Sequence, residues 1–148
     1  MPNLIMVFAV LAFAQLLAGE EWRSFRGPTG MGVTQKKIPL SWNSNSIIWK
    51  TRLPGNGQSS VVEAGDSIFV TAGENSGAKR SLLCLSKTEG RIVWKKTITF
   101  NENEDSHRMN GWCTPTPATF ENRVVAFFGP AGLFCFSTEG EMLSLIHI

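Results

Sequence analysis

A β-hairpin pattern that occurs twice constrains this chain more than any other feature of its sequence. Residues 82–94 carry an apolar run with a cysteine, a polar turn ending in Glu-Gly, and a second apolar run. Residues 133–143 repeat most of this pattern about 50 residues further along. Each copy is typical of two strands joined by a tight turn. The chain therefore contains a repeated β-hairpin.

The repeat extends upstream of the hairpin, because residues 60–72 align with residues 116–128. A period of about 50 residues with four short strands is the sequence signature of propeller blades. One such sheet cannot bury both of its faces alone, so it needs neighbouring sheets. We predict an all-β chain whose one complete four-stranded blade has strands near residues 59–64, 67–72, 81–86 and 91–98.

Residues 84–94 resemble the docking motif of pyrroloquinoline quinone (PQQ)-like β-propeller repeats, which runs Ala-x-Asp-x-x-Thr-Gly-x-x-x-Trp. Gly90 and Trp94 match this motif, and Cys84 stands for its small first residue. Ser86 and Glu89 depart from the Asp and Thr of the motif. The resemblance implies a PQQ-like β-propeller.

The same resemblance implies a clasp between blades, since the Trp of one blade in this family packs over the Gly of its neighbour. Carried onto this chain, the clasp residues are Trp49, Gly90, Trp94 and Gly140. Residues 22–32 are also similar to the Trp-x-x-Phe-Arg-Gly-Pro segment that opens secreted members of the group. The clasp implies architecture and no chemistry.

The N-terminus carries an uncharged apolar run over residues 4–18, followed by a small pair and two glutamates. Its length fits a signal peptide and is short for a membrane span. We therefore expect residues 1–19 to be a cleaved signal peptide and the protein to be secreted or periplasmic. Residues 1–3 contain no Lys or Arg, so a retained anchor stays open as the alternative. The first cysteine is Cys84, which leaves no cysteine for a lipid anchor.

The remaining segments are assigned by composition and by the internal alignment. Residues 46–53 match residues 91–98 and are expected to be the outer strand of a blade that closes the ring with strands from elsewhere. Ser144 stands where the first repeat has Trp94, so the end departs from the repeat. The expected order after the signal peptide is an extended lead-in (20–45), the outer strand (46–53), the complete blade (59–98), a connection (99–111), an incomplete next blade (112–143) and a foreign or frame-shifted tail (144–148). The chain is thus expected to be an N-terminal fragment with one complete blade and parts of two others.

The charge pattern argues against nucleic acid as a partner. The formal net charge is +2, and the basic residues form separated pairs without interleaved aromatic residues. A nucleic-acid track requires a clustered basic face.

The sequence offers no catalytic, metal-binding or cofactor-binding residues. Cys84 and Cys135 occupy equivalent places and are expected to be buried as small apolar side chains. Cys113 lies in a connection, where a pairing with either of them stays open. His107 lies near Glu102, Glu104 and Asp105, a group expected to be a solvated loop and not a metal site.

The connection before the second repeat supplies the candidate contacts for a partner: His107, Arg108, Asn110 and Trp112. The alternative for Trp112 is packing between blades. We expect a non-catalytic scaffold that binds an unknown protein or glycan. The alternative is a PQQ-dependent alcohol or sugar dehydrogenase, with PQQ and calcium as cofactors and catalytic residues outside this sequence. A PQQ-like fold alone does not decide between them.

Overall fold

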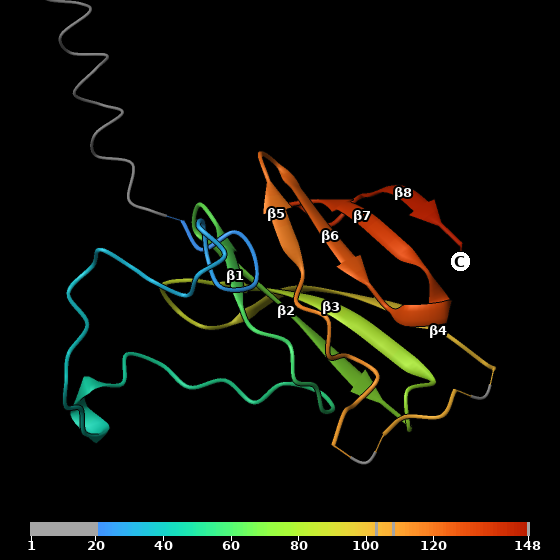
Figure 1. The fold of residues 1–148 in the computed structure, drawn as a ribbon, viewed down its shortest axis with the longest axis horizontal. Helices are drawn as coiled ribbons and strands as arrows, with labels where there is room; N and C mark the ends of the chain where they lie inside the picture. The colour runs from blue at the N-terminus through green and yellow to red at the C-terminus, as the bar shows by residue number, and fades with distance from the viewer. Residues whose placement is uncertain (1–20, 103, 108, 148) are drawn as a thin grey trace, which may run out of the picture.

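The computed structural model describes residues 21–102, 104–107 and 109–147, and these form two antiparallel four-stranded sheets (Figure 1). The strands of the first sheet are β1 (Val62–Ala64), β2 (Ser67–Glu74), β3 (Lys79–Ser86) and β4 (Ile92–Thr99). Those of the second sheet are β5 (Ala118–Phe120), β6 (Arg123–Phe127), β7 (Leu133–Ser137) and β8 (Met142–Ile146). The order of the strands in each sheet is their order in the chain, so each sheet is a meander. The prediction of an all-β fold is confirmed.

The strands of the first sheet lie close to the residues that the sequence pattern predicts. The loop between β2 and β3 is shorter than expected, because β2 continues to Glu74 and β3 already begins at Lys79. Their pairing also continues as far as these two residues. The apolar and β-branched residues of β2 and β3 favour strands, and the polar loop Asn75–Ala78 ends them.

The two sheets have the same register around their cysteines. In the first sheet Cys84 pairs with Phe69 on β2 and with Trp94 on β4. In the second sheet Cys135 pairs with Val125 on β6 and with Ser144 on β8. The pairing of the third and fourth strands shifts directly after each cysteine. The cysteines therefore mark equivalent positions of two similar sheets.

The second sheet differs from the expectation of an incomplete unit. Its fourth strand, β8, continues to Ile146, so Ser144 to Ile146 belong to the sheet and not to a separate tail. Leu145 packs against the core between the sheets, and Ile146 pairs with Leu133. Ladder pairing and one inward apolar side chain are enough to form this strand without the Trp of the first repeat.

The outer strand expected at residues 46–53 is absent. A short 3₁₀ helix, η1 (Ser44–Ser46), precedes the segment, and residues 47–53 form no strand. Figure 1 shows this part of the chain leaving the sheets as an open loop. The β-branched and apolar residues of the segment favour a strand, but a strand also needs a neighbour for its backbone groups. No described strand lies along it.

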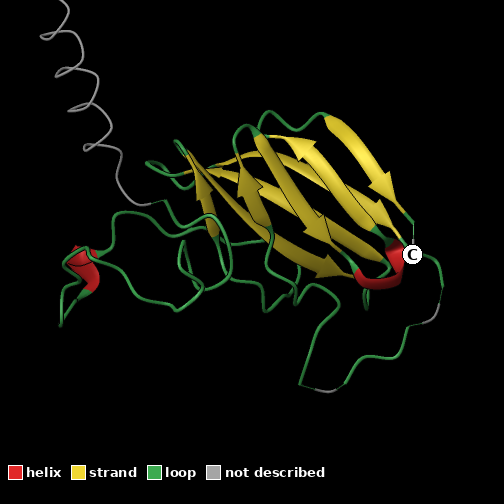
Figure 2. Cartoon of the chain, turned by 45° about the horizontal axis from the view of Figure 1, so that its top comes forward, coloured by secondary structure: helices red, strands yellow, loops and turns green. Residues whose placement is uncertain are grey.

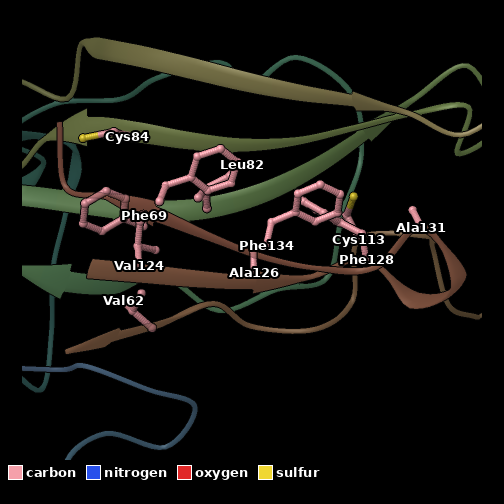
Figure 3. Close-up of a cluster of buried hydrophobic side chains, with 11 residues drawn as sticks. Val62, Phe69, Leu82, Cys84, Cys113, Val124, Ala126, Phe128, Ala131 and Phe134 are labelled. Carbon is pink, nitrogen blue, oxygen red and sulfur yellow. The ribbon is translucent and has the colours of Figure 1, made fainter. Parts of the chain in front are cut away.

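The two sheets pack face to face, as Figure 2 shows, and enclose the main core. Side chains from both sheets meet there, and Figure 3 shows them in close-up. The first sheet contributes Val62, Phe69, Leu82 and Cys84, the second contributes Val124, Ala126, Phe134 and Phe136, and Phe128 joins them from the residue directly after β6. Burial of such side chains stabilises by about 1.5–3 kcal/mol each. This apolar interface is what holds the sheets together.

The outward face of each sheet has a different environment. On the first sheet Val70, Leu83 and Leu85 are buried, and Leu53 packs against them. On the second sheet, the side chains that point away from the first sheet are those of Val125, Phe127, Leu133 and Cys135. We call the surface that they form the outer face of the second sheet. Phe127 is 39% exposed. The outer face of the second sheet is thus only partly covered.

The beginning of the described chain ties the first strands of the two sheets, β1 and β5, together. The Trp22 carbonyl accepts the backbone N–H of Glu63 on β1 at 2.9 Å, and the Arg23 carbonyl accepts that of Thr119 on β5 at 2.8 Å. The Thr119 hydroxyl also donates to the Glu63 carbonyl at 2.9 Å. The expected signal peptide, residues 1–19, lies outside the described residues. No helix among the described residues is long and apolar enough to span a membrane.

Candidate functional site

Two tryptophans lie on glycines at equivalent turns of the two sheets. A Cβ placed on Gly90 would lie 2.4 Å from the ring of Trp49, and one on Gly140 would lie 3.1 Å from the ring of Trp94. Both glycines have positive φ, +71° and +91°, which favours glycine on its own. Each turn therefore needs a residue without a side chain for two separate reasons.

The indole N–H groups fix both tryptophans in the same way. Trp49 donates to the Lys87 carbonyl at 2.9 Å, and Trp94 donates to the Thr138 carbonyl at 2.9 Å. The Thr51 hydroxyl adds a bond of 2.6 Å to the Gly90 carbonyl. Trp94 joins β4 of the first sheet to the β7–β8 turn of the second sheet. Trp49 joins the segment before β1 to the β3–β4 turn.

The two buried cysteines, Cys84 and Cys113, are packed in the core and have raised thiol pKa values. Cys84 and Cys113 are buried, Cys135 is half-buried, and all three are free thiols. Burial raises the pKa of the Cys113 thiol to about 11, and burial also raises the pKa of Cys84. A raised pKa lowers the fraction of reactive thiolate at neutral pH. Among the described residues, no three His, Cys, Asp or Glu side chains are grouped to hold a metal ion.

Three of the four residues predicted to contact a partner are described by the structure, and each has different surroundings. His107 is exposed, and its Nδ1 accepts the backbone N–H of Met109 at 3.3 Å. Asn110 is exposed at the edge of a cavity. Trp112 is half-buried and packs on Gly77 of the β2–β3 loop. Arg108 lies outside the described residues. The structure therefore brings Asn110 and Trp112 together at one cavity, and His107 does not line it.

Trp112 is held in place by its surroundings. Its indole N–H donates to the Glu104 carbonyl at 3.1 Å, and a Cβ on Gly77 would lie 2.3 Å from its ring. Gly77 has a φ of +84°, which only glycine adopts readily. The sequence did suggest packing for Trp112, but it gave no sign that the β2–β3 loop supplies the glycine.

Arg80 is a buried cation that no sequence motif marks. It is 1% exposed, and its guanidinium binds the Gly77 and Phe128 carbonyls and the Glu104 carboxylate. The guanidinium also lies 4.7 Å from the centre of the Phe100 ring. Arg80 thus fastens the connection after β4 to both sheets. A buried charge of this kind requires such a complete set of partners.

The connection and the β2–β3 loop border a cavity of about 440 Å³, which we call the hairpin-end cavity. Its polar side chains are mainly amides, and its only apolar side chain is that of Trp112. The side chains that face it include Asn56, Gln58, Asn75, Ser76, Asn110 and Trp112. A second cavity of about 480 Å³, which we call the acidic cavity, shares Trp112 and is bordered by Glu102, Glu104 and Asp105. The two cavities lie at the same end of the first sheet.

A third cavity, of about 580 Å³, lies at the other end of the sheets, beside Trp94. Cys84 and Ser67 line it from the first sheet, and Asn122 and Glu139 line it from the second. The Thr138 hydroxyl, which binds the exposed Glu139 carboxylate at 2.8 Å, lowers the pKa of that carboxyl. Burial raises the pKa of the Cys84 thiol in this cavity, which makes it a poor nucleophile at neutral pH.

Comparison with known proteins adds no relative. No protein-family model matches the chain, and no curated protein matches it.

Proposed function

We propose that this chain belongs to a secreted or periplasmic PQQ-like β-propeller that acts as a non-catalytic binding scaffold. The observation that carries the proposal is the repeated contact of a tryptophan with a glycine at equivalent turns. Trp94 makes this contact between the sheets, with its indole N–H bound to a turn carbonyl. The docking motif of PQQ-like repeats is expected to make such a clasp. The proposal therefore takes the two sheets as consecutive blades.

The unequal covering of the sheet faces supports the same assignment. The face of the first sheet that contains Phe69, Leu82 and Cys84 is covered by the second sheet. The equivalent face of the second sheet carries Val125 and Cys135 at the same register positions and is only partly covered. A propeller blade has a neighbour on each face, which would cover these side chains as well.

The chemistry of the described residues favours binding over catalysis. Burial raises the pKa of two of the three thiols, which makes them poor nucleophiles. The hairpin-end cavity is bordered by amides, a hydroxyl and an indole, which are groups that recognise a ligand by hydrogen bonds and packing. Connections at the edge of a rigid scaffold are where binding residues gather. A protein or a glycan is the proposed kind of partner.

Reconstitution tests the proposal. The whole protein, with any residues encoded beyond this sequence, is incubated with PQQ and Ca²⁺, separated from unbound quinone, and assayed for dye reduction with ethanol and with glucose. We expect no retained quinone and no reduction of the dye. Retained quinone together with turnover would overturn the scaffold assignment in favour of the dehydrogenase. A retained quinone without turnover would also overturn it, since the proposal assigns no quinone site.

Export is tested separately, because residues 1–19 lie outside the described residues. The chain is expressed in a Gram-negative host, and the mature N-terminus is sequenced from the periplasmic fraction. We expect a sequence that begins near residue 20. Full-length chain in the cytoplasm would contradict export, and full-length chain in the membrane would indicate a retained anchor.

A further inference from the structure

We propose that the hairpin-end cavity is a binding site for a neutral carbohydrate. The inference rests on the proposed function, since it gives the scaffold a class of partner. The cavity volume of about 440 Å³ lies within the range of sites for small ligands. Its walls come from three parts of the chain: the segment before β1, the β2–β3 loop and the connection after β4. The site is therefore built by the fold and not by a single loop.

The polar groups of the cavity suit a ligand rich in hydroxyl groups. Each amide side chain both donates and accepts hydrogen bonds, as each sugar hydroxyl does. Within the described part of the chain, the side chains of Asn56, Asn75 and Asn110 make no hydrogen bond to the protein. The Oε1 of Gln58 accepts the Gly111 N–H at 2.8 Å, which fixes the orientation of its amide. Three exposed residues whose amides have no hydrogen-bond partner among the described residues thus line one cavity.

The charges around the cavity favour a neutral ligand. Glu74 is its one charged side chain, and the Lys95 ammonium binds that carboxylate at 3.0 Å. The acidic cavity beside it carries Glu102 and Asp105, which would repel a phosphate or a uronic acid, while the Arg80 guanidinium that also lines it is paired with Glu104. An anionic saccharide is therefore expected to bind worse than a neutral one.

Trp112 is the apolar side chain that lines the cavity, and it would contact a sugar ring through the indole face that Gly77 does not cover. The C–H groups of a pyranose pack on the electron-rich face of an aromatic ring. Trp112 is already fixed by Gly77 and by its bond to the Glu104 carbonyl, so binding costs little ordering of the indole. Pre-ordering of this kind distinguishes Trp112 from Trp42, which is 75% exposed.

The β2–β3 loop has Ser76 at a position where glycine would fit more easily. Asn75 and Ser76 both have a φ of +52°, and the Gly77 N–H donates to the Glu74 carbonyl at 3.1 Å. A turn with positive φ at both central residues usually has Asn followed by Gly. Ser76 therefore adopts a strained conformation while presenting a hydroxyl at the cavity. Strain of this kind is often retained at binding sites.

A peptide fits the same cavity less well. Peptides are recognised by strand addition at a sheet edge or by apolar pockets for their side chains. The cavity lies at a loop end, and Trp112 is its only apolar side chain. Carbohydrate is therefore the class that we propose, and peptide binding is an outcome of the test.

The test uses isothermal titration calorimetry of the full chain with defined probes. The neutral probes are cellohexaose, maltohexaose, mannohexaose and chitohexaose, the acidic probe is hexagalacturonate, and the peptide probe is an uncharged Gly-Ser hexapeptide. We expect at least one neutral hexasaccharide to bind with a dissociation constant of about 1 mM or tighter. We expect hexagalacturonate and the peptide to bind at least about tenfold more weakly.

Variants then locate the binding. Asn110→Ala is expected to weaken binding about fivefold, the effect of one lost hydrogen bond between neutral groups. Ser76→Gly is expected to weaken binding about threefold while raising the melting temperature, because it removes a hydroxyl and relieves the turn. Trp112→Ala is expected to abolish binding. The matched controls, Asn122→Ala and Trp42→Ala, lie outside the cavity and should leave the affinity unchanged.

The outcomes separate this inference from the proposed function. Absence of binding by every neutral probe at about 10 mM would overturn the carbohydrate site, and so would binding that Asn110→Ala and Ser76→Gly leave unchanged. Tighter binding of the peptide would also overturn it. None of these results affects a scaffold that is exported and retains no quinone. Quinone turnover would instead remove the proposed function, whatever the sugar titration shows.

Discussion

The two sheets of this chain have the same strand order and register but different surroundings. The first sheet is covered on one face by the second sheet and on the other by Leu53 and its neighbours. The second sheet is covered by the first sheet on one face and only partly covered on the other, where Phe127 is 39% exposed. A meander of this kind has two apolar faces and needs two neighbours. Equivalent substitutions on the two sheets therefore show how much the covering of a face contributes to the free energy of unfolding.

The largest expected effect is on the free energy of unfolding, when a phenylalanine is removed from the covered face or from the partly covered face. Phe69 is fully buried between the sheets, so Phe69→Ala should destabilise the fold by about 3–5 kcal/mol. Phe127→Ala removes the same side chain from the outer face of the second sheet and should cost less than about 1 kcal/mol. Urea denaturation measures both. Equal costs would show that the two faces are covered alike.

The two equivalent cysteines, Cys84 and Cys135, should differ in their rate of alkylation because only one lies between the sheets. Cys84 is 1% exposed with a raised pKa, whereas Cys135 is half-buried on the outer face of the second sheet. Iodoacetamide should therefore alkylate Cys135 at least about tenfold faster than Cys84. Mass spectrometry of timed samples measures both rates, and the urea-unfolded chain is the control in which they should converge. Faster alkylation of Cys84 would place it outside the interface.

The connection between the sheets depends on the buried Arg80. Glu104→Gln removes the carboxylate partner of this guanidinium and leaves its charge with neutral acceptors only. Since Glu104 is partly exposed, we expect a loss of about 1–2 kcal/mol, less than for a fully buried pair. Glu102→Gln, on the same connection, is the matched control and should change stability by less than about 0.5 kcal/mol. A similar loss in both variants would contradict the role of Arg80.

The smallest expected effect is on the pH dependence of stability, through the contact of Glu63 on the first sheet with Trp22 of the lead-in. Burial opposes ionisation of Glu63, but the Lys87 ammonium and the Trp22 backbone N–H outweigh it and lower the pKa of this carboxyl. Because the pKa is lower in the folded chain, the stabilisation is present above the usual range of a glutamate and is lost as pH falls through the folded-state value.

Glu63→Gln should therefore reduce stability by less than about 1 kcal/mol near neutral pH. It should also flatten the decline in stability below about pH 4.5. Urea denaturation of both proteins at a series of pH values measures this difference. Glu89→Gln, in the exposed pair with Arg91, is the control and should keep the decline. An unchanged acid decline in Glu63→Gln would exclude this carboxylate as its source.

The sequence predicted the all-β fold and the strand positions because both depend on local apolar alternation and on the repeat. It also placed Cys84 and Cys135 in matching third strands, since the repeat aligns them directly. It predicted a strand at residues 46–53 that is absent, because local preference cannot supply a pairing strand. It predicted a tail from Ser144 because the Trp of the first repeat is missing there, but the pairing of β8 with β7 continues to Ile146 without that Trp.

The candidate site was less accessible to prediction. Asn110 and Trp112 were identified because they lie on a polar connection, but their companions on the β2–β3 loop and before β1 come together only in three dimensions. In the sequence, Arg80 belongs to one of the separated basic pairs. It can be buried because its guanidinium binds Glu104 and the Gly77 and Phe128 carbonyls, and the sequence alone does not show these contacts. Asn75 is a usual residue at the first position of such a turn, but positive φ at Ser76 has no sequence signal, since glycine usually occupies that position.

The central claim is that the sheets are equivalent units joined by a tryptophan on a glycine, and proton chemical shifts test it most directly. Gly140 lies against the Trp94 ring and Gly90 against the Trp49 ring, so ring currents should move the Hα resonances of both glycines upfield. Trp94→Leu should return only Gly140 to an ordinary shift, and Trp49→Leu should return only Gly90. Ordinary glycine shifts in the unaltered protein, or a Trp94→Leu variant that leaves Gly140 unchanged, would contradict the account.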